Sequence, residues 1–388
     1  MEKLDFEKIR EEEFPATRRW AYLNAAAHGL SPRCVINPMK DFLESALHDG
    51  LVKGMSQYKL QGPLREKMAK LIHAETGEVA IARNTSDALS AIANGIRFKE
   101  GENVIVNDLE FPAVVYCWMN LEKKGVKTRL VKNIDGKILV DDIERNIDEN
   151  TRVVAISSVS ALTGFRAELE KIGGLCKERN IYFVVDAIQQ LGALDLDVKK
   201  CHIDMLASGC YKWLNVPDGV GFLFVDKNVL EELDVSKVGW WNVKNEKAFT
   251  HVPGATYDLT FKDDARRFQE SHAGVTGVLG LIGSLNLIFK IGIENIEKRV
   301  LHLTDLLIEG VRGLGIKVVS PLEKEYRSGI VVIDLKNNEE AYDMLMKNNI
   351  CTCLRRMGLR ISPHFYNNEE EIEKLLKVLE DDRFRCNT

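Results

Sequence analysis

The chain has 388 residues, of which 45% are hydrophobic and 29% charged, and its formal net charge is -5. This length predicts two domains, and the composition is that of an ordinary soluble globular protein. The weak negative charge offers no basic footprint for nucleic acid, no apolar run approaches the roughly 20 residues that a membrane-spanning helix needs, and the charged N-terminus lacks the apolar core of a signal peptide.

Short apolar runs alternate with helical stretches between about residues 77 and 225. The expected strands are 79–82, 103–106, 128–131, 153–156, 182–185, 204–207 and 220–225. Their nearly continuous apolar character indicates strands that are covered on both faces, as in a largely parallel sheet between layers of helices. We therefore expect an α/β fold with a mostly parallel seven-stranded sheet, and ligands at the carboxyl ends of its strands.

The pattern changes after this region. A long helix is expected over 278–311, interrupted near Gly292, and it is followed by strands at 316–320 and 329–334 and helices at 338–348 and 368–381. These elements indicate a smaller α+β domain. We expect an N-terminal arm (1–20) that packs on the small domain, a large domain (21–275) and the small C-terminal domain (276–388).

The most informative residues are a lysine and an acid at the ends of two expected strands. Asp186 ends the strand 182–185, and Lys212 follows the strand 204–207. Pyridoxal phosphate (PLP) enzymes need a lysine amine that forms a Schiff base with the aldehyde and a carboxylate that pairs with the protonated pyridine nitrogen. Each residue alone has a simpler interpretation, a surface charge for the lysine and a helix cap for the acid. Together with Gln189, which could donate to the phenolic oxygen of the cofactor, they predict a PLP site.

Two further segments follow expected strands. Thr85 and Ser86 lie between a strand and the amphipathic helix 88–96, where backbone N–H groups and the positive helix end favour a phosphate. Simple N-capping is the alternative. Phe111, after the strand 103–106, could stack on the pyridine ring, or it could be a core phenylalanine.

Candidate substrate ligands lie near the C-terminus. Arg360 interrupts a strand-like segment and could clamp a substrate carboxylate, with Arg355 and Arg356 as competitors. A solvated surface charge is the alternative for each arginine. His272 is expected to be either a polar wall residue or a phosphate donor.

The number and spacing of the cysteines indicate whether the chain binds a metal and in which cell compartment it works. The eight cysteines are scattered mostly inside apolar runs, which is typical of free thiols in a reducing cytoplasm. Cys351 and Cys353 have no second Cys/His pair nearby, so we expect no metal site.

With these residues identified, the chain resembles the aminotransferase class V superfamily of fold-type-I PLP-dependent enzymes, which includes cysteine desulfurases, selenocysteine lyases, isopenicillin N epimerase-like proteins and kynureninases. The resemblance extends from residues 22–29 to 361–367, and its strongest segments are 183–192, 211–214 and 264–268. It implies a homodimer with the active site at the subunit boundary, and a small amino acid as the substrate.

The resemblance also implies a role for each matching residue. Lys212 would be the Schiff-base lysine and Asp186 the partner of the pyridine nitrogen, while Arg360 would hold the substrate α-carboxylate. The remaining cofactor contacts would come from Thr85, Ser86 and Tyr211 at the phosphate, Gln189 at the phenolic oxygen, Phe111 on the ring, and Ser271 and His272 at the neighbouring subunit's phosphate.

The chain departs from the family pattern at Tyr211, where many relatives have histidine, at Ser271 and His272, which replace the usual Gly-Thr, and at Ala161. Two further departures concern the desulfurases. Desulfurases stack a titratable histidine on the ring, whereas Phe111 cannot titrate. Their nucleophilic cysteine lies on a loop well before the carboxylate arginine, whereas Cys351 and Cys353 lie in a strand-like run, which favours buried structural thiols. We therefore expect an aminotransferase first. The alternatives are C–S or C–Se cleavage, epimerisation, and a non-enzymatic ligand sensor or scaffold.

Overall fold

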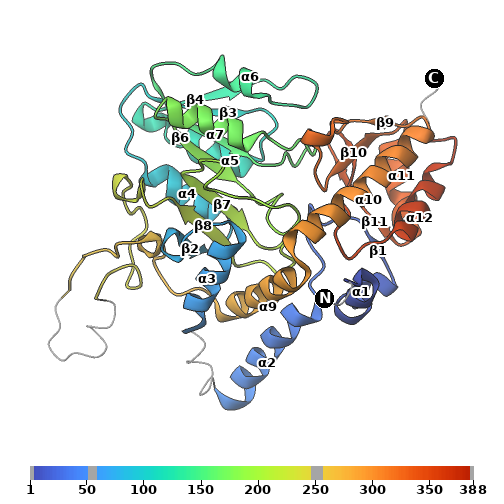
Figure 1. The fold of residues 1–388 in the computed structure, drawn as a ribbon, viewed down its shortest axis with the longest axis horizontal. Helices are drawn as coiled ribbons and strands as arrows, with labels where there is room; N and C mark the ends of the chain where they lie inside the picture. Colours follow the sequence, from blue (N-terminus) through green and yellow to red (C-terminus); the bar gives the residue numbers. More distant parts are fainter. Residues whose placement is uncertain (1–3, 51–58, 246–256, 385–388) are drawn as a thin grey trace.

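The computed structural model describes residues 4–50, 59–245 and 257–384 (Figure 1). Its centre is a seven-stranded sheet in the order β2-β8-β7-β6-β5-β3-β4. The strands are β2 (Val79–Ala82), β3 (Asn103–Asn107), β4 (Lys127–Val131), β5 (Thr151–Ser157), β6 (Tyr182–Asp186), β7 (Met205–Gly209) and β8 (Gly221–Val225). Only β8 runs against its neighbours β2 and β7; the other pairs are parallel. The predicted mostly parallel seven-stranded sheet is confirmed.

The apolar runs form a central sheet because both of its faces are covered. Successive residues of a strand point to opposite faces, so Ile105 belongs to one buried apolar cluster and Val104 and Val106 to the other. The same alternation separates Val154 from Val153. Helices that cover the sheet include α3 (Gln61–Leu71), α4 (Thr85–Gly95), α5 (Pro112–Met119) and α7 (Leu169–Glu178).

A bent pair of helices leads from the sheet to the C-terminal elements (Figure 1). The helices α9 (Val275–Ile291) and α10 (Ile293–Gly313) meet at Gly292, whose φ of 87° favours glycine, and their axes bend there by 81°. The predicted interruption is thus confirmed. No single helix in the described ranges is long and apolar enough to cross a membrane; α9 and α10 pass that test only as a pair, across the bend.

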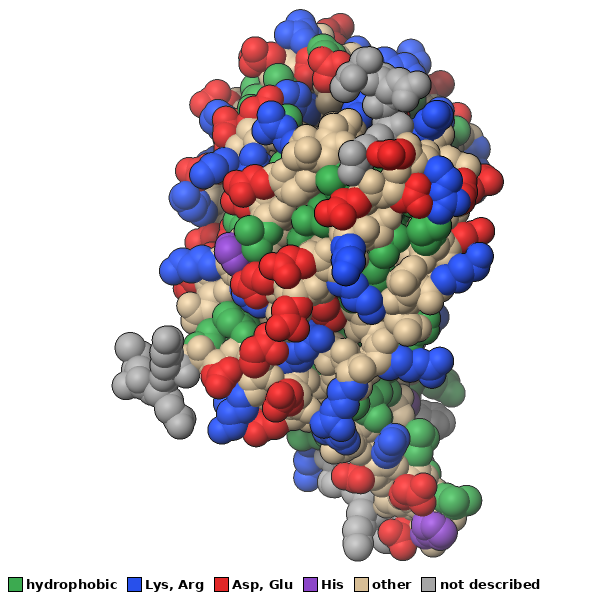
Figure 2. Space-filling model, turned by 90° about the vertical axis from the view of Figure 1, so that its right-hand side faces the viewer, with side chains coloured by type: hydrophobic (Ala, Val, Ile, Leu, Met, Phe, Trp, Pro, Cys, Tyr) green, Lys and Arg blue, Asp and Glu red, His purple; other side chains and the backbone are tan. Residues whose placement is uncertain are grey.

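The C-terminal part contains a four-stranded sheet in the order β12-β13-β10-β9. Its strands are β9 (Lys317–Val318), β10 (Val331–Asp334), β12 (Cys353–Arg355) and β13 (Gly358–Ile361), and its helices are α11 (Asn338–Lys347) and α12 (Glu369–Leu379). These helices and α10 pack on the sheet around a third apolar cluster. On the face shown in Figure 2, acidic and basic side chains are interspersed.

The N-terminal segment contacts the C-terminal elements. Helix α1 (Phe6–Glu13) holds Arg10, whose guanidinium pairs with Glu371 on α12 at 2.9 Å. Strand β1 (Ala21–Tyr22) pairs in parallel with β11 (Ile350–Cys351). The contacts agree with an N-terminal arm on the small domain. The limits of the domains stay a prediction.

Candidate functional site

A cavity of ≈ 310 Å³ lies at the carboxyl edge of the sheet, beyond the ends of β2, β5, β6 and β7. The cavity brings together seven of the nine predicted site residues, namely Thr85, Ser86, Phe111, Asp186, Gln189, Tyr211 and Lys212. Asn84, Ala113, Ser157, Ala161, Ile188 and Asp218 complete its lining. The other two predicted residues, Arg360 and His272, lie outside this lining.

Lys212 lies in the loop after β7, with only 9% of its surface exposed. Burial lowers the pKa of its amine to about 8; Asp186 acts in the opposite direction. The amine is 5.9 Å from the ring centroid of Phe111. The loop is held by Gly29, whose N–H donates to the Tyr211 carbonyl at 2.9 Å. A Cβ at Gly29 would lie 2.0 Å from the Lys212 carbonyl oxygen, so only glycine allows this approach.

Asp186 is the last residue of β6 and is 3% exposed. One carboxylate oxygen accepts a hydrogen bond from the Ile188 N–H at 2.9 Å. Burial raises the pKa of this carboxyl to about 6, against the lowering effects of that hydrogen bond and of the Lys212 charge. A cation placed between Lys212 and Asp186, such as a protonated ring nitrogen, would favour the ionised carboxylate.

The start of α4 forms the anion-binding end of the cavity. Asn84 is the N-cap, and its side chain accepts from the Asp87 N–H at 2.9 Å. The capping role therefore belongs to Asn84, and Thr85 and Ser86 are the first two residues of the helix, whose N–H groups lack partners within it. Thr85 Oγ1 also accepts from the Gly209 N–H at 2.8 Å, which fixes the helix to the end of β7.

Arg360 reaches the cavity wall from β13. Its guanidinium donates from Nη1 to the carbonyl of Ala161, a lining residue, at 3.0 Å. Within the described chain its Nε and Nη2 atoms are buried without a hydrogen-bond partner. Buried guanidinium nitrogens without partners are costly, so this arrangement fits an anion that is bound there in the working protein.

Cys353 is the cross-strand partner of Arg360 in the β12–β13 pair. Directly opposite residues of an antiparallel pair point to the same face of the sheet. The thiol interacts with the guanidinium, and this interaction raises the pKa of Arg360 while burial lowers it. Cys353 is partly exposed, not buried. Sequence reasoning did not find this contact, because it depends on the register of two short strands.

Gln189, Phe111 and His272 have surroundings that the sequence did not predict. Gln189 lines the cavity, but its amide accepts from Trp213 Nε1 at 2.9 Å and donates to the Ala26 carbonyl at 3.1 Å. Phe111 is 58% exposed on the rim. His272 lies beside Trp241, with ring centroids 6.2 Å apart, so a contact with a phosphate of a neighbouring subunit stays a prediction.

Glu110 lies outside the cavity lining but is hydrogen-bonded to the lining residue Ser157, and sequence reasoning assigned it no role. Its carboxylate accepts hydrogen bonds from the Ser157 N–H at 2.8 Å, from the Ser157 hydroxyl and from Asn107. Burial raises the pKa of Glu110 to about 7, and the charge of Asp186 adds to this effect. A sequence pattern shows an acid beside Phe111 but not that its side chain turns back toward β5.

Glu110→Gln is expected to reduce the pH dependence of stability of the cofactor-free protein. The pKa of Glu110 is raised from 4.5 to about 7 on folding. Its contribution is therefore fully present below pH 4.5 and is lost as the pH rises through 7. The amide preserves the neutral form, so the variant should match the parent near pH 5 and exceed it by up to about 3 kcal/mol near pH 8. Urea unfolding at the two pH values measures this. Glu170→Gln, on an exposed carboxylate, is the control.

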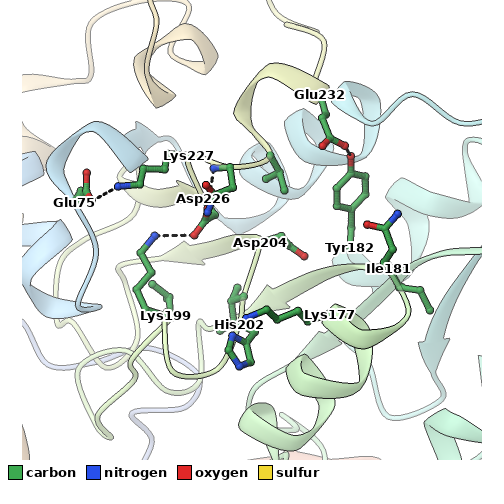
Figure 3. A pocket seen from close by; sticks show the side chains of 15 residues that line it. Glu75, Lys177, Ile181, Tyr182, Lys199, His202, Asp204, Asp226, Lys227 and Glu232 are labelled. Carbon is green, nitrogen blue, oxygen red and sulfur yellow. Dashed lines mark hydrogen bonds and ion pairs between the residues drawn. The ribbon is translucent and has the colours of Figure 1, made fainter.

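A larger cavity of ≈ 600 Å³ lies at the opposite edge of the sheet, beside the starts of β6 and β7 (Figure 3). Its charged groups largely pair with one another: Lys199 lies 2.7 Å from Asp226, Lys227 pairs with Glu75, and the Tyr182 hydroxyl donates to Glu232. We therefore place the functional site in the smaller cavity, where a buried amine and a buried acid face one space.

The donor set of the smaller cavity fits PLP. The buried amine of Lys212 suits the aldehyde, and Asp186 suits the ring nitrogen. The start of α4 suits the phosphate. Each contact stays a prediction.

Comparison with known proteins also indicates a PLP-dependent enzyme. The chain is 29% identical to the "Probable cysteine desulfurase" of Pyrococcus abyssi over 97% of each chain, and 27% identical to the "Uncharacterized aminotransferase YcbU" of Bacillus subtilis over 92% of this chain and 93% of that one. The apo structure of the cysteine desulfurase from Thermococcus onnurineus superposes with a TM-score of 0.87 at 24% identity, covering 98% of this chain and 99% of that one.

A solved complex of a cystine C–S lyase shares the fold, with a TM-score of 0.87 at 20% identity over 96% of this chain and 100% of that one. Class V aminotransferases are PLP-dependent enzymes, which confirms the predicted cofactor and the prediction of an enzyme. The family model of the class V aminotransferases matches residues 21–375, nearly the whole chain, and the protein therefore belongs to the aminotransferase class-V family.

Proposed function

We propose that this enzyme cleaves the C–S bond of a cysteine-like amino acid, with Lys212 and Asp186 as its catalytic residues. The observation that carries the proposal is the strand register, which places Cys353 directly opposite Arg360 on one face of the β12–β13 pair, and Arg360 reaches the wall of the Lys212 cavity. If Arg360 binds the substrate α-carboxylate, the Cys353 thiol lies beside the substrate. The names of several relatives, among them probable cysteine desulfurases, support the same reaction class.

Bound PLP would supply an electron-accepting ring that stabilises negative charge at the substrate α-carbon. Lys212 would hold the cofactor aldehyde and later take the α-proton on Nζ. Its pKa of about 8 lies below the ordinary value of 10.5, which enlarges the unprotonated fraction near neutral pH that a general base requires. Asp186 would keep the ring nitrogen protonated, and Arg360 would orient the α-carboxylate.

The remaining cofactor contacts form a second part of the proposal. Thr85, Ser86 and Tyr211 would bind the phosphate, and Phe111 would lie against the ring. Gln189 would contribute its remaining amide hydrogen to the phenolic oxygen, because Ala26 and Trp213 already use the other positions.

The sulfur step uses Cys353 as the acceptor. The Cys353 thiolate would attack the sulfur of bound cysteine, forming an S–S bond, while the electron pair of the broken C–S bond stays on the carbon chain. A proton completes alanine, and the products are one alanine and one persulfide on Cys353. Added thiol then releases the sulfur as sulfide.

Amino transfer was the first expectation from the sequence, and it shares the early steps with C–S cleavage. The two reactions differ in their products, because amino transfer yields a keto acid and leaves the substrate sulfur in place. The position of Cys353 opposite Arg360 favours C–S cleavage, since amino transfer has no use for a thiol there.

Cys353→Ser is expected to lower alanine and sulfide formation from L-cysteine more than about 100-fold, because the sulfur acceptor is lost. Cys351→Ser, which changes the neighbouring thiol of β11, is the matched control and should retain most of the activity. The assay loads the protein with PLP, adds L-cysteine and a thiol reductant, and quantifies alanine, sulfide, pyruvate and other keto acids. Keto acid without sulfide in the parent protein would contradict C–S cleavage and support amino transfer.

We also propose that the enzyme works as a homodimer. Phe111 and Trp240 are 58% and 52% exposed, and burial of such large apolar side chains at a subunit boundary would remove them from water. Sedimentation velocity of the PLP-loaded protein tests this.

A further inference from the structure

His28 contacts two residues of the wall of the Lys212 cavity. Its ring centroid is 5.7 Å from that of Tyr211, and its Nε2 atom is 3.5 Å from a carboxylate oxygen of Asp218. Tyr211 and Asp218 both line the cavity. The site described above leaves His28 without a role, although its imidazole borders the space in which the cofactor would lie.

Tyr211 lies next to the start of α4. A Cβ at Gly209 would be 3.1 Å from Cε1 of Tyr211 and 3.3 Å from Oγ1 of Thr85, so the tyrosine ring and the threonine hydroxyl flank one point at the end of β7. The tyrosine beside His28 therefore belongs to the anion-binding end of the cavity.

Asp218 places a negative charge at the same end. It lies three residues before Gly221, where a Cβ would be only 3.1 Å from Cα of Asn84, the N-cap of α4. Among the described residues that line the cavity, Lys212 is the only cation, and its amine would be engaged by the cofactor aldehyde. A phosphate, with about two negative charges near neutral pH, would therefore meet Asp218 without a lining cation to offset it.

The backbone on both sides of His28 is tied to lining residues. The Ala26 carbonyl accepts from Gln189 Nε2 at 3.1 Å, and the Gly29 N–H donates to the Tyr211 carbonyl at 2.9 Å. These two hydrogen bonds fix the position of the His28 backbone against the cavity wall.

Both ring nitrogens of His28 face acceptors. Nδ1 lies 3.0 Å from the Gly29 carbonyl oxygen, and Nε2 faces the Asp218 carboxylate. A neutral imidazole carries one N–H and can donate to only one of them, whereas an imidazolium donates to both. These surroundings suit a positively charged ring.

We propose that His28 supplies the positive charge that helps to bind the cofactor phosphate, as an imidazolium that offsets Asp218. His28 is thus a further cofactor-binding residue beside Thr85, Ser86 and Tyr211. The inference rests on the PLP site, and it does not depend on which bond of the substrate is broken.

Absorbance titration of the cofactor-free protein with PLP and with pyridoxal, which lacks the phosphate, tests this role. His28→Asn should weaken PLP binding about tenfold, as loss of one charge-assisted contact does, and should change pyridoxal binding by less than about twofold. Retained pyridoxal binding shows that the site is folded. His73→Asn is the matched control and should change neither ligand, because His73 pairs with Asp195 at 3.2 Å outside the lining of this cavity.

A second substitution tests the charge itself. The carboxylate of Asp218 is uncompensated in His28→Asn, so adding Asp218→Asn should recover most of the lost PLP affinity. Inorganic phosphate should compete with PLP in the parent, and about tenfold less effectively in His28→Asn.

Four results would overturn the inference: unchanged PLP affinity in His28→Asn, an equal loss for PLP and pyridoxal, an equal effect of His73→Asn, or no recovery in the double variant. A parent protein that shows the expected PLP and pyridoxal affinities but releases no sulfur from L-cysteine would contradict only the proposed C–S cleavage.

Discussion

Lys212→Ala is expected to abolish turnover, with a loss of more than about 1,000-fold, and to remove the visible absorbance of the protein-bound cofactor. The reason is that one amine would serve twice, first to hold the cofactor aldehyde and then to move the α-proton. Its burial, at 9% exposure, gives it the lowered pKa that both tasks need. Absorbance titration with PLP and turnover of L-cysteine measure the two effects.

Lys227→Ala is the control for this experiment, because Lys227 lies in the larger cavity at the opposite edge of the sheet and pairs there with Glu75. Its removal should leave spectrum and turnover intact. A Lys212→Ala protein that keeps both the absorbance and the activity would show that the amine acts elsewhere.

Asp186→Asn is expected to lower the turnover of the PLP-loaded enzyme and to raise the stability of the cofactor-free protein. Turnover should fall by about 100- to 10,000-fold, because an amide cannot keep the ring nitrogen protonated. The cofactor should still bind covalently, since Lys212 is unchanged.

The cofactor-free Asp186→Asn protein should be more stable than the parent above pH 6. The pKa of Asp186 is raised from 3.8 to about 6, so its contribution to stability is present at acid pH and is lost as the pH rises through 6. The amide avoids a buried charge, and above pH 6 the variant should gain up to about 3 kcal/mol. Urea unfolding at pH 5 and 8, with turnover measured on the same samples, tests both halves. A variant that loses activity and stability together would indicate a merely structural role.

Much of the fold followed from local patterns. The continuous apolar runs identified the inner strands of the main sheet, because strands covered on both faces tolerate few polar residues in their interior. The edge strand β4 (KTRLV) is largely exposed, and its predicted position 128–131 is nevertheless confirmed. Gly292 marked the bend between α9 and α10, since its positive φ suits glycine. Asp186 and Lys212 were recognisable because both follow strands, and the ends of neighbouring strands meet at one edge of the sheet.

Other features depend on tertiary detail that one sequence does not contain. The cap of α4 is Asn84, one residue before the predicted pair Thr85 and Ser86. Local sequence signals do not fix the end of a helix to within one residue. The contact between Cys353 and Arg360 arises from strand register, which turn and packing set together. The turn of Glu110 toward Ser157 depends on side-chain direction alone.

The central claim is that Lys212 holds the cofactor across a single ring from Asp186. The most direct test is to load the protein with PLP, reduce it with borohydride, digest it and locate the modified peptide by mass spectrometry. We expect a phosphopyridoxyl group on Lys212, and no such modified peptide from Lys212→Ala. Modification of a different lysine in the parent protein, with Lys212 unmodified, would contradict the account.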